Sequence, residues 1–170
     1  ITGKYISPTD IKDITNPKDP KDNSKLEVLF EKMSKSKYNG IDPESVIKKY
    51  GADTARMFIL FKAPPEKDLE WGDSDVEGQY RFLCRIWKLF LDYSNNDITH
   101  EADKLKKENE SSLLKSINIA IKEISNDIKN NQFNTAISEL MKFYNSISSN
   151  LNHVNKDLRR EALMKFCILL

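Results

Sequence analysis

The chain has 170 residues, enough for one domain with a hydrophobic core, or for one domain and part of another. Charged side chains make up 31% of it, yet the net charge is only +1, so any contact with nucleic acid must come from locally segregated basic residues. The two cysteines lie far apart in the sequence, with no spacing for a metal or redox pair, which fits a reducing, cytosol-like compartment. No apolar run approaches the roughly 20 residues that span a bilayer.

The first 30 or so residues are polar and rich in proline, with Pro8, Pro17 and Pro20 close together. Prolines at this density prevent a helix and favour a surface excursion or hairpin. The apolar residues of the following 26–30 segment predict a short strand. That strand would lead into the next segment.

Residues 32–36 read Lys-Met-Ser-Lys-Ser, with a further lysine at Lys37. Nothing nearby is apolar enough to bury them, so the segment predicts an exposed loop that carries cations. Lysine ammonium groups on flexible stems suit polyphosphate oxygens. Lys35 is the first candidate for a phosphate contact and Lys32 the second. Ser34 and Ser36 either donate hydrogen bonds there or simply keep the loop small, and the sequence leaves both readings open.

Two short helices are predicted after this loop. Asp42 followed by Pro43 is a typical helix start, and Gly51 sits where that helix would end in a left-handed residue. Asp53 is then expected to cap a second helix, apolar nearly all round and therefore buried. Pro64 ends it.

From Asp73 onward, apolar residues recur at steps of three and four, which predicts long amphipathic helices. Four such helices joined by short loops predict an antiparallel bundle, so the fold class is mainly α. The expected core stripes are Val76, Tyr80, Leu83, Trp87, Phe90 and Leu91 in the first; Leu114, Ile117, Ile121, Ile124 and Ile128 in the second; Phe133, Ala136, Ile137, Leu140, Met141, Tyr144 and Ile147 in the third; and Leu158, Ala162, Leu163, Phe166, Cys167 and Leu170 in the fourth.

Arg81 and Arg85 lie one helical turn apart, opposite an apolar face, so they are expected to project outward together. They are candidate contacts to nucleic-acid backbone phosphates, with a plain solvated pair as the alternative. The aromatic residues of the same region are expected in the core rather than as stacking platforms. Cys84 and Cys167 are expected to be small core residues.

Several segments together resemble the leucyl-tRNA synthetases, a branch of the class I aminoacyl-tRNA synthetases. The 32–36 segment matches the Lys-Met-Ser-Lys-Ser signature of the class. Two segments resemble the isoleucyl, valyl, methionyl and leucyl enzymes as a group: Asn39–Pro43 and Lys49–Arg56. The segments that resemble the leucyl enzymes specifically are Pro64–Trp71, Val76–Gly78 and Arg81–Trp87, with a weaker similarity at Phe133–Ala136. Asp75 stands where the leucyl pattern usually has Gly.

This resemblance implies that residues 1–72 end a catalytic domain with the signature loop and a stem-contact region, and that residues 73–170 are an incomplete anticodon-binding bundle. It further implies that ATP, with Mg²⁺, binds at Lys32, Ser34, Lys35 and Ser36. The expected partners are leucine and tRNA(Leu), and the expected enzyme is monomeric and cytoplasmic, without a membrane segment. No His-x-x-His pair is present, so the nucleotide-binding half is expected upstream and this piece alone is expected to be inactive.

Two alternatives stay open. One is a noncatalytic tRNA-binding helical module. The other is a fragment of a related isoleucyl, valyl or methionyl enzyme, which the Asp68–Trp71 segment disfavours.

Overall fold

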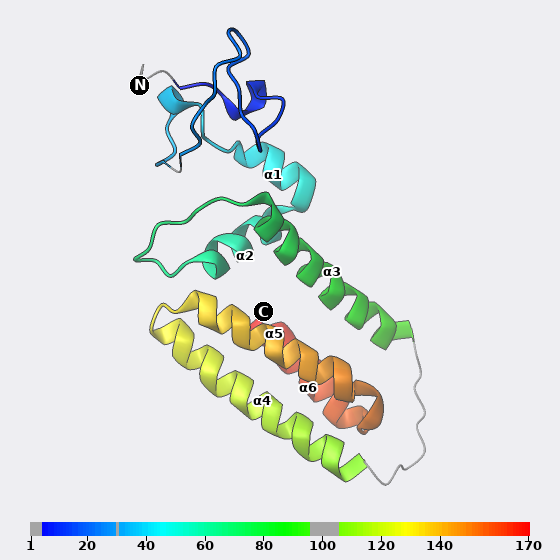
Figure 1. The fold of residues 1–170 in the computed structure, drawn as a ribbon. Helices are drawn as coiled ribbons and strands as arrows, with labels where there is room; N and C mark the ends of the chain where they lie inside the picture. Colours follow the sequence, from blue (N-terminus) through cyan, green and yellow to red (C-terminus); the bar gives the residue numbers. More distant parts are fainter. Residues whose placement is uncertain (1–4, 30, 96–105) are drawn as a thin grey trace. The chain divides into compact units, whose positions relative to one another are not determined.

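The computed structural model describes residues 5–29, 31–95 and 106–170, and it confirms the mainly α-helical fold class (Figure 1). Two compact units are present, Ile1–Lys49 and Tyr50–Leu170, and the domain boundary expected after residue 72 stays a prediction. The helices in the described ranges are α1 (Pro43–Tyr50), α2 (Ala52–Lys62), α3 (Asp73–Asn95), α4 (Lys106–Lys129), α5 (Phe133–Asn150) and α6 (Lys156–Leu169). None of the helices described is both long enough and apolar enough to cross a membrane.

Apart from α1 at its end, the described residues of the first unit form turns and short 3₁₀ segments. An isolated antiparallel bridge joins Lys18 to Lys25 around a turn in which Asn23 has a φ of 59°. The strand predicted over 26–30 is wrong for its described residues, 26–29, which form no strand. Val28 and Leu29 are exposed, and no second segment among the described residues pairs with their backbone, as a strand requires.

The expected start and end of α1 are confirmed. Asp42 accepts hydrogen bonds from the backbone N–H groups of Glu44 (3.2 Å) and Ser45 (3.1 Å), which caps the helix ahead of Pro43. Gly51 follows α1 with a φ of 85°, a backbone conformation that side chains disfavour.

Helix α2 departs from the prediction in two respects. Gly51 occupies the N-cap position, and Asp53 lies inside the first turn without capping it. Only one side of the helix is buried: Phe58 is fully enclosed and meets Trp71 edge to face at 5.0 Å, whereas Ile59 and Leu60 are exposed. The helix therefore packs on one face, against α3 and α5, although its sequence is apolar nearly all round.

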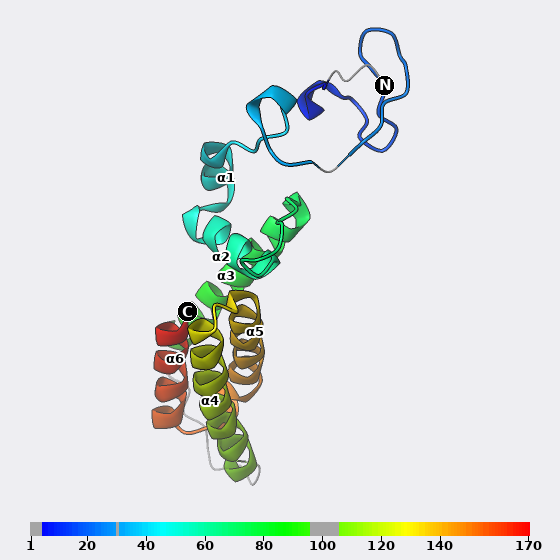
Figure 2. The ribbon, with the colours of Figure 1, turned by 90° about the vertical axis from the view of Figure 1, so that its left-hand side faces the viewer.

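The predicted bundle is present. Helices α4, α5 and α6 lie side by side (Figure 2), and α3 packs its inner face against them. Asn131, with a φ of 58°, makes the left-handed turn between α4 and α5. Asn155 caps α6 by accepting from the N–H of Leu158 (2.8 Å), and its amide nitrogen donates to Glu110 on α4 (2.7 Å).

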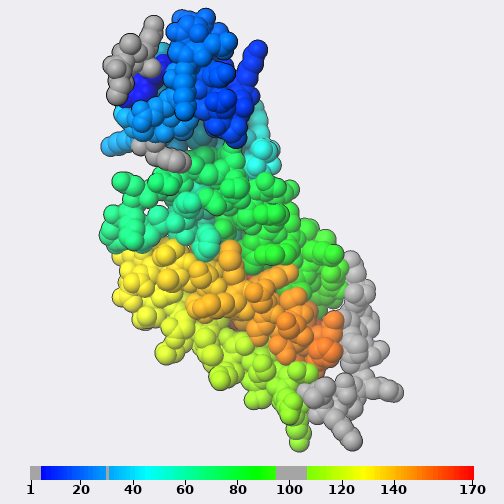
Figure 3. Space-filling view, in the orientation of Figure 1, coloured from blue at the N-terminus to red at the C-terminus, as the bar shows by residue number. Residues whose placement is uncertain are grey.

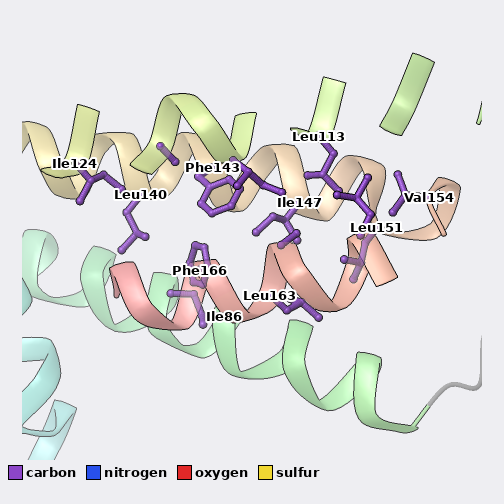
Figure 4. Close-up of a cluster of buried hydrophobic side chains, with 14 of the residues drawn as sticks. Ile86, Leu113, Ile124, Leu140, Phe143, Ile147, Leu151, Val154, Leu163 and Phe166 are labelled. Atoms are coloured by element: carbon purple, nitrogen blue, oxygen red, sulfur yellow. The ribbon is translucent and has the colours of Figure 1, made fainter. Parts of the chain in front are cut away.

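A cluster of aromatic rings forms the centre of the core. Phe166 of α6 is fully buried, with its ring centroid 5.8 Å from that of Phe143 and 6.3 Å from that of Tyr144, both on α5. Its ring lies 6.4 Å from that of Phe90 on α3. Figure 4 shows Ile86 of α3 and Leu140 of α5 beside the same ring. One side chain thus joins three helices.

Two of the predicted stripes are rotated relative to the observed core. On α3 the buried residues are Val76, Gln79, Phe82 and Ile86, while Tyr80, Trp87 and Leu91 are exposed. On α4, Ile117 and Ile124 are buried as expected, but Leu114 and Ile128 are exposed, and Leu113 and Ala120 are buried instead. Both sequences hold more apolar residues than one face can bury, so spacing alone left the face ambiguous.

We expect Phe166→Ala to lower the free energy of unfolding by about 3–5 kcal/mol, because it empties a ring-sized volume shared by three helices. The measurement is urea unfolding followed by circular dichroism. Ile168→Ala on the same helix is the control: its side chain is 74% exposed, so a change within about 0.5 kcal/mol is expected. Equal losses in the two variants would contradict the assignment of the core.

Candidate functional site: a cationic loop and an exposed helix face

The signature segment forms a short, exposed turn. Ser34 is extended, Lys35–Lys37 make one turn of 3₁₀ helix, and Tyr38 reverses the chain in the left-handed region with a φ of 54°. The N–H of Lys37 donates to the carbonyl of Ser34 (3.2 Å), which closes the turn. The side chains of Lys32, Lys35 and Ser36 are exposed, as expected.

Asn39 holds the two ends of this loop together. Its Oδ1 accepts the backbone N–H of Ser34 (2.9 Å), while its Nδ2 donates to the carbonyls of Glu31 (3.2 Å) and Lys32 (3.4 Å). One amide therefore binds three backbone positions on the incoming side of the loop. The sequence analysis missed this role, although an Asn-Gly pair directly after a Lys/Ser loop is a turn signal that could have suggested it.

The third lysine is already engaged within the chain. Lys37 Nζ forms an ion pair with Glu31 Oε2, and it also lies 5.4 Å from the centroid of the Tyr5 ring. The Tyr5 hydroxyl donates to the same carboxylate at 3.1 Å. The hydrogen bond from Lys37, and then that from Tyr5, hold the pKa of Glu31 below its ordinary value, and Glu31 in turn raises the pKa of Lys37.

Lys32 and Lys35 differ from Lys37 in having no carboxylate partner among the described residues. Their ammonium groups stand in water on a loop whose backbone is fixed by Asn39. The Oγ atoms of Ser34 and Ser36 lie 3.1 Å apart, so one hydroxyl donates to the other and the second proton remains available. This arrangement offers cations and a hydroxyl donor to a multiply charged anion.

No group of three possible metal ligands occurs in the part of the chain that the structure describes. A magnesium ion bound with a nucleotide commonly keeps several waters and takes ligands from the phosphates themselves.

Arg81 and Arg85 are both exposed on α3, as predicted. Arg85 packs on two rings: its guanidinium carbon lies 5.7 Å from the Phe82 ring centroid and 5.9 Å from that of Tyr144. Arg81 lines a hollow between α2, α3 and α5, together with Asn134, Ser138 and the aromatic residues Phe58 and Phe61. The two arginines thus point out of one helix without a carboxylate partner among the described residues.

The predicted placement of the neighbouring residues is wrong in several cases. Trp87 is 69% exposed and Tyr80 is 41% exposed, whereas Phe82 is buried as expected. Cys84 and Cys167 are exposed rather than in the core. The neighbouring Cys84 side chain raises the pKa of the Tyr80 phenol. His153 is exposed, and His100 lies outside the described residues.

The Glu31–Lys37 pair generates a pH prediction. Because the pKa of Glu31 is lowered in the folded loop, its contribution to loop order is present above the ordinary glutamate pKa and is lost as the pH falls through the lowered value. In Lys37→Met, the pKa of Glu31 is expected to rise toward its ordinary value, as measured by carboxyl NMR titration. Lys35→Met is the control and should leave that pKa unchanged, and an equal rise in both variants would contradict a specific pair.

Two family models match the chain. The model for class I tRNA synthetases of the I, L, M and V group matches residues 30–72, which include the signature loop, α1 and α2. The model for the anticodon-binding domain of tRNA ligases matches residues 110–169, which cover most of α4 and all of α5 and α6.

The curated relatives agree. A leucine–tRNA ligase of Prochlorococcus marinus subsp. pastoris is 99% identical over 170 residues, which are all of this chain and 20% of that protein. One from Prochlorococcus marinus strain MIT 9515 is 82% identical over 169 residues, again 20% of its length. The chain therefore spans about a fifth of the length of these relatives.

A solved structure gives the same result. The Agrobacterium radiobacter LeuRS, crystallised as a ternary complex with tRNA and LeuAMS, superposes with a TM-score of 0.71 and 25% identity, over 81% of this chain and 18% of that one. With two family models, near-identical relatives and this fold in agreement, the chain belongs to the leucyl-tRNA synthetase family of class I, as a segment that carries the signature loop and part of the anticodon-binding domain.

Proposed function

We propose that this segment serves leucine–tRNA ligase in two ways: its loop contacts the ATP phosphates during leucine activation, and α3 contacts tRNA(Leu). The observation that carries the first part is the pair of exposed ammonium groups, Lys32 and Lys35, on a loop tied by Asn39. The near-identity to leucine–tRNA ligases supports the choice of reaction.

The chemistry follows from where charge develops. When the leucine carboxylate attacks the α-phosphate of ATP, the bond to the leaving pyrophosphate breaks and negative charge accumulates on that group. Cations already in place there stabilise the transition state more than the bound substrates. Lys35 begins the 3₁₀ turn and Lys32 lies just before it, so both reach outward from the same short loop. The Ser34–Ser36 pair supplies a further hydrogen-bond donor.

The reaction needs more than this segment. His100 and His153 are the only histidines, and they lie too far apart to form the His-x-x-His pair of the nucleotide-binding half. We therefore assign leucine binding and the remaining ATP contacts to the rest of a full-length, monomeric and cytoplasmic enzyme. Mg²⁺ would enter with the ATP phosphates. The segment alone is expected to be inactive.

The second part of the proposal concerns tRNA. Arg81 and Arg85 are exposed on α3 and lack carboxylate partners among the described residues, and a guanidinium is suited to backbone phosphates. Stacking of Arg85 against Phe82 and Tyr144 fixes its position before any ligand arrives. The match of residues 110–169 to an anticodon-binding domain and the tRNA in the related LeuRS complex support this partner.

In the full-length enzyme, Lys35→Ala is expected to slow leucine-dependent ATP–pyrophosphate exchange by about 10²–10³-fold, the effect typical of removing one preorganised transition-state interaction. Leucine affinity should change little. Lys48→Ala is the matched control, because Lys48 is an exposed lysine of the same unit that pairs with Glu44. An unchanged rate of ATP–pyrophosphate exchange in Lys35→Ala would contradict the catalytic part of the proposal.

For tRNA, replacing both Arg81 and Arg85 by Gln is expected to weaken binding and to reduce the salt dependence of the affinity, by about 0.7–0.9 in slope for each phosphate that is no longer neutralised. Filter binding at several salt concentrations measures both quantities. Arg160→Gln, on the exposed surface of α6, is the control and should leave the slope unchanged. A double variant with the parent's affinity and slope would remove α3 from the tRNA interface.

A further inference from the structure

The outward side of α3 combines exposed rings with cations. Phe82 and Ile86 face the core, so the opposite side of the helix is left free of the bundle. Figure 3 shows a length of α3 at the surface beside α5. We call this side the outer face of α3, defined by the exposed residues Tyr80, Cys84, Trp87 and Lys88. Arg81, which lines the hollow beside α5, lies at its edge, and Arg85 packs against Tyr144 of α5.

Trp87 is the feature that needs an explanation. An indole carries one of the largest apolar surfaces of any side chain, yet this one is 69% exposed in the middle of a long, well-packed helix. Tyr80 stands two turns earlier on the same face, 41% exposed, with its ring 5.8 Å from that of Tyr50. Both rings thus stand at the surface, and Tyr80 is held in place.

The charges on this face identify the kind of partner. From Gly78 to Leu91 the sequence contains three basic residues and no carboxylate, although carboxylates flank the stretch at Glu77 and Asp92. Arg81 and Lys88 lie seven residues apart, a span of about 10 Å along a helix. Elsewhere in the bundle, the exposed apolar residues of α4 lie on a helix that mixes Lys122 and Lys129 with Glu123 and Asp127.

An apolar protein partner would not select an exposed indole with Lys88 beside it in the sequence and Arg81 at the edge of the same face. A polyanion with flat rings would, since single-stranded nucleotides stack on aromatic side chains while cations bind the adjacent phosphates. We infer that the outer face of α3 is an RNA-binding surface on which the Trp87 indole stacks against an unpaired nucleotide, with Arg81 and Lys88 on the neighbouring phosphates.

This inference rests on the proposed tRNA-binding function and adds to it an interaction of a different kind. Arginine and lysine bound to phosphates release counterions and therefore set the salt dependence of the affinity, whereas stacking of an uncharged ring does not. The two kinds of interaction are therefore separable by experiment. Replacing Trp87 should therefore lower the affinity for tRNA without changing the slope of its salt dependence.

The test uses the full-length enzyme with Trp87→Ala, Trp87→Leu and Trp87→Phe, and measures tRNA(Leu) affinity across a salt series. Stacking predicts a loss of at least about fivefold for Ala and for Leu, with Phe within about twofold of the parent and the slope unchanged in all three. Met164→Ala, an exposed apolar residue of α6, is the control and should match the parent.

Leucine-dependent ATP–pyrophosphate exchange, which needs no tRNA, reports whether the face instead packs against the rest of the enzyme. Exchange within about twofold of the parent supports RNA as the partner, whereas a collapse of exchange or of the urea midpoint in the Ala and Leu variants overturns it. Unchanged tRNA affinity in Trp87→Ala also overturns it. If the arginine double variant still changes the salt slope in that case, the proposed tRNA function stands and only the stacking interaction falls.

Discussion

The burial of Phe166 fixes the geometry on which the helical unit depends. This one ring lies against Phe90 of α3 and against Phe143 and Tyr144 of α5, and it is itself carried by α6. Because three helices meet at the same side chain, the rotation of α3 about its own axis is coupled to the packing of α5 and α6. That rotation decides which residues of α3 face outward. The exposure of the arginines, of Lys88 and of Trp87 is therefore a consequence of core packing.

The first unit, which carries the signature loop, is stabilised by other interactions than the helical unit. Among its described residues Val46 is the one buried apolar side chain, and polar interactions stabilise the loop: the Asn39 amide binds the backbone, and the Glu31 carboxylate binds Lys37 and Tyr5. Such interactions are individually modest in water, which suits a segment that we propose presents charge to a substrate whose own charge changes during the reaction. The lysine nearest the end of the turn is neutralised within the chain. The two others remain available.

The structure was predicted most accurately from the sequence at positions where a residue type permits only one local conformation. Asp42 before Pro43 marked the start of α1, and Gly51 its end, because capping and positive φ allow few alternatives. The exposure of the signature loop was predictable for the same reason, since lysines and serines without apolar neighbours are not buried in a core. The family resemblance rested on these fixed points and was correct.

Prediction failed where several residues competed for the same role. On α3 the sequence offers aromatic and aliphatic residues around most of the helix, and only the tertiary packing chooses Phe82 and Ile86 over Trp87. The strand expected after residue 25 failed because a strand is defined by a partner that the local pattern does not contain. The Asn39 bonds joined residues five to eight positions apart through a side chain with many possible partners.

The bonds made by Asn39 also constrain how this chain can change in length. A residue added or removed between Glu31 and Asn39 would shift the two backbone carbonyls and the N–H of Ser34 away from a single amide that must reach them all. The turn between Lys18 and Lys25 is closed by its own local hydrogen bonds, so an inserted residue there would cost little beyond loop entropy. The first unit therefore joins a segment of fixed length to one that tolerates insertion, within a short stretch of chain.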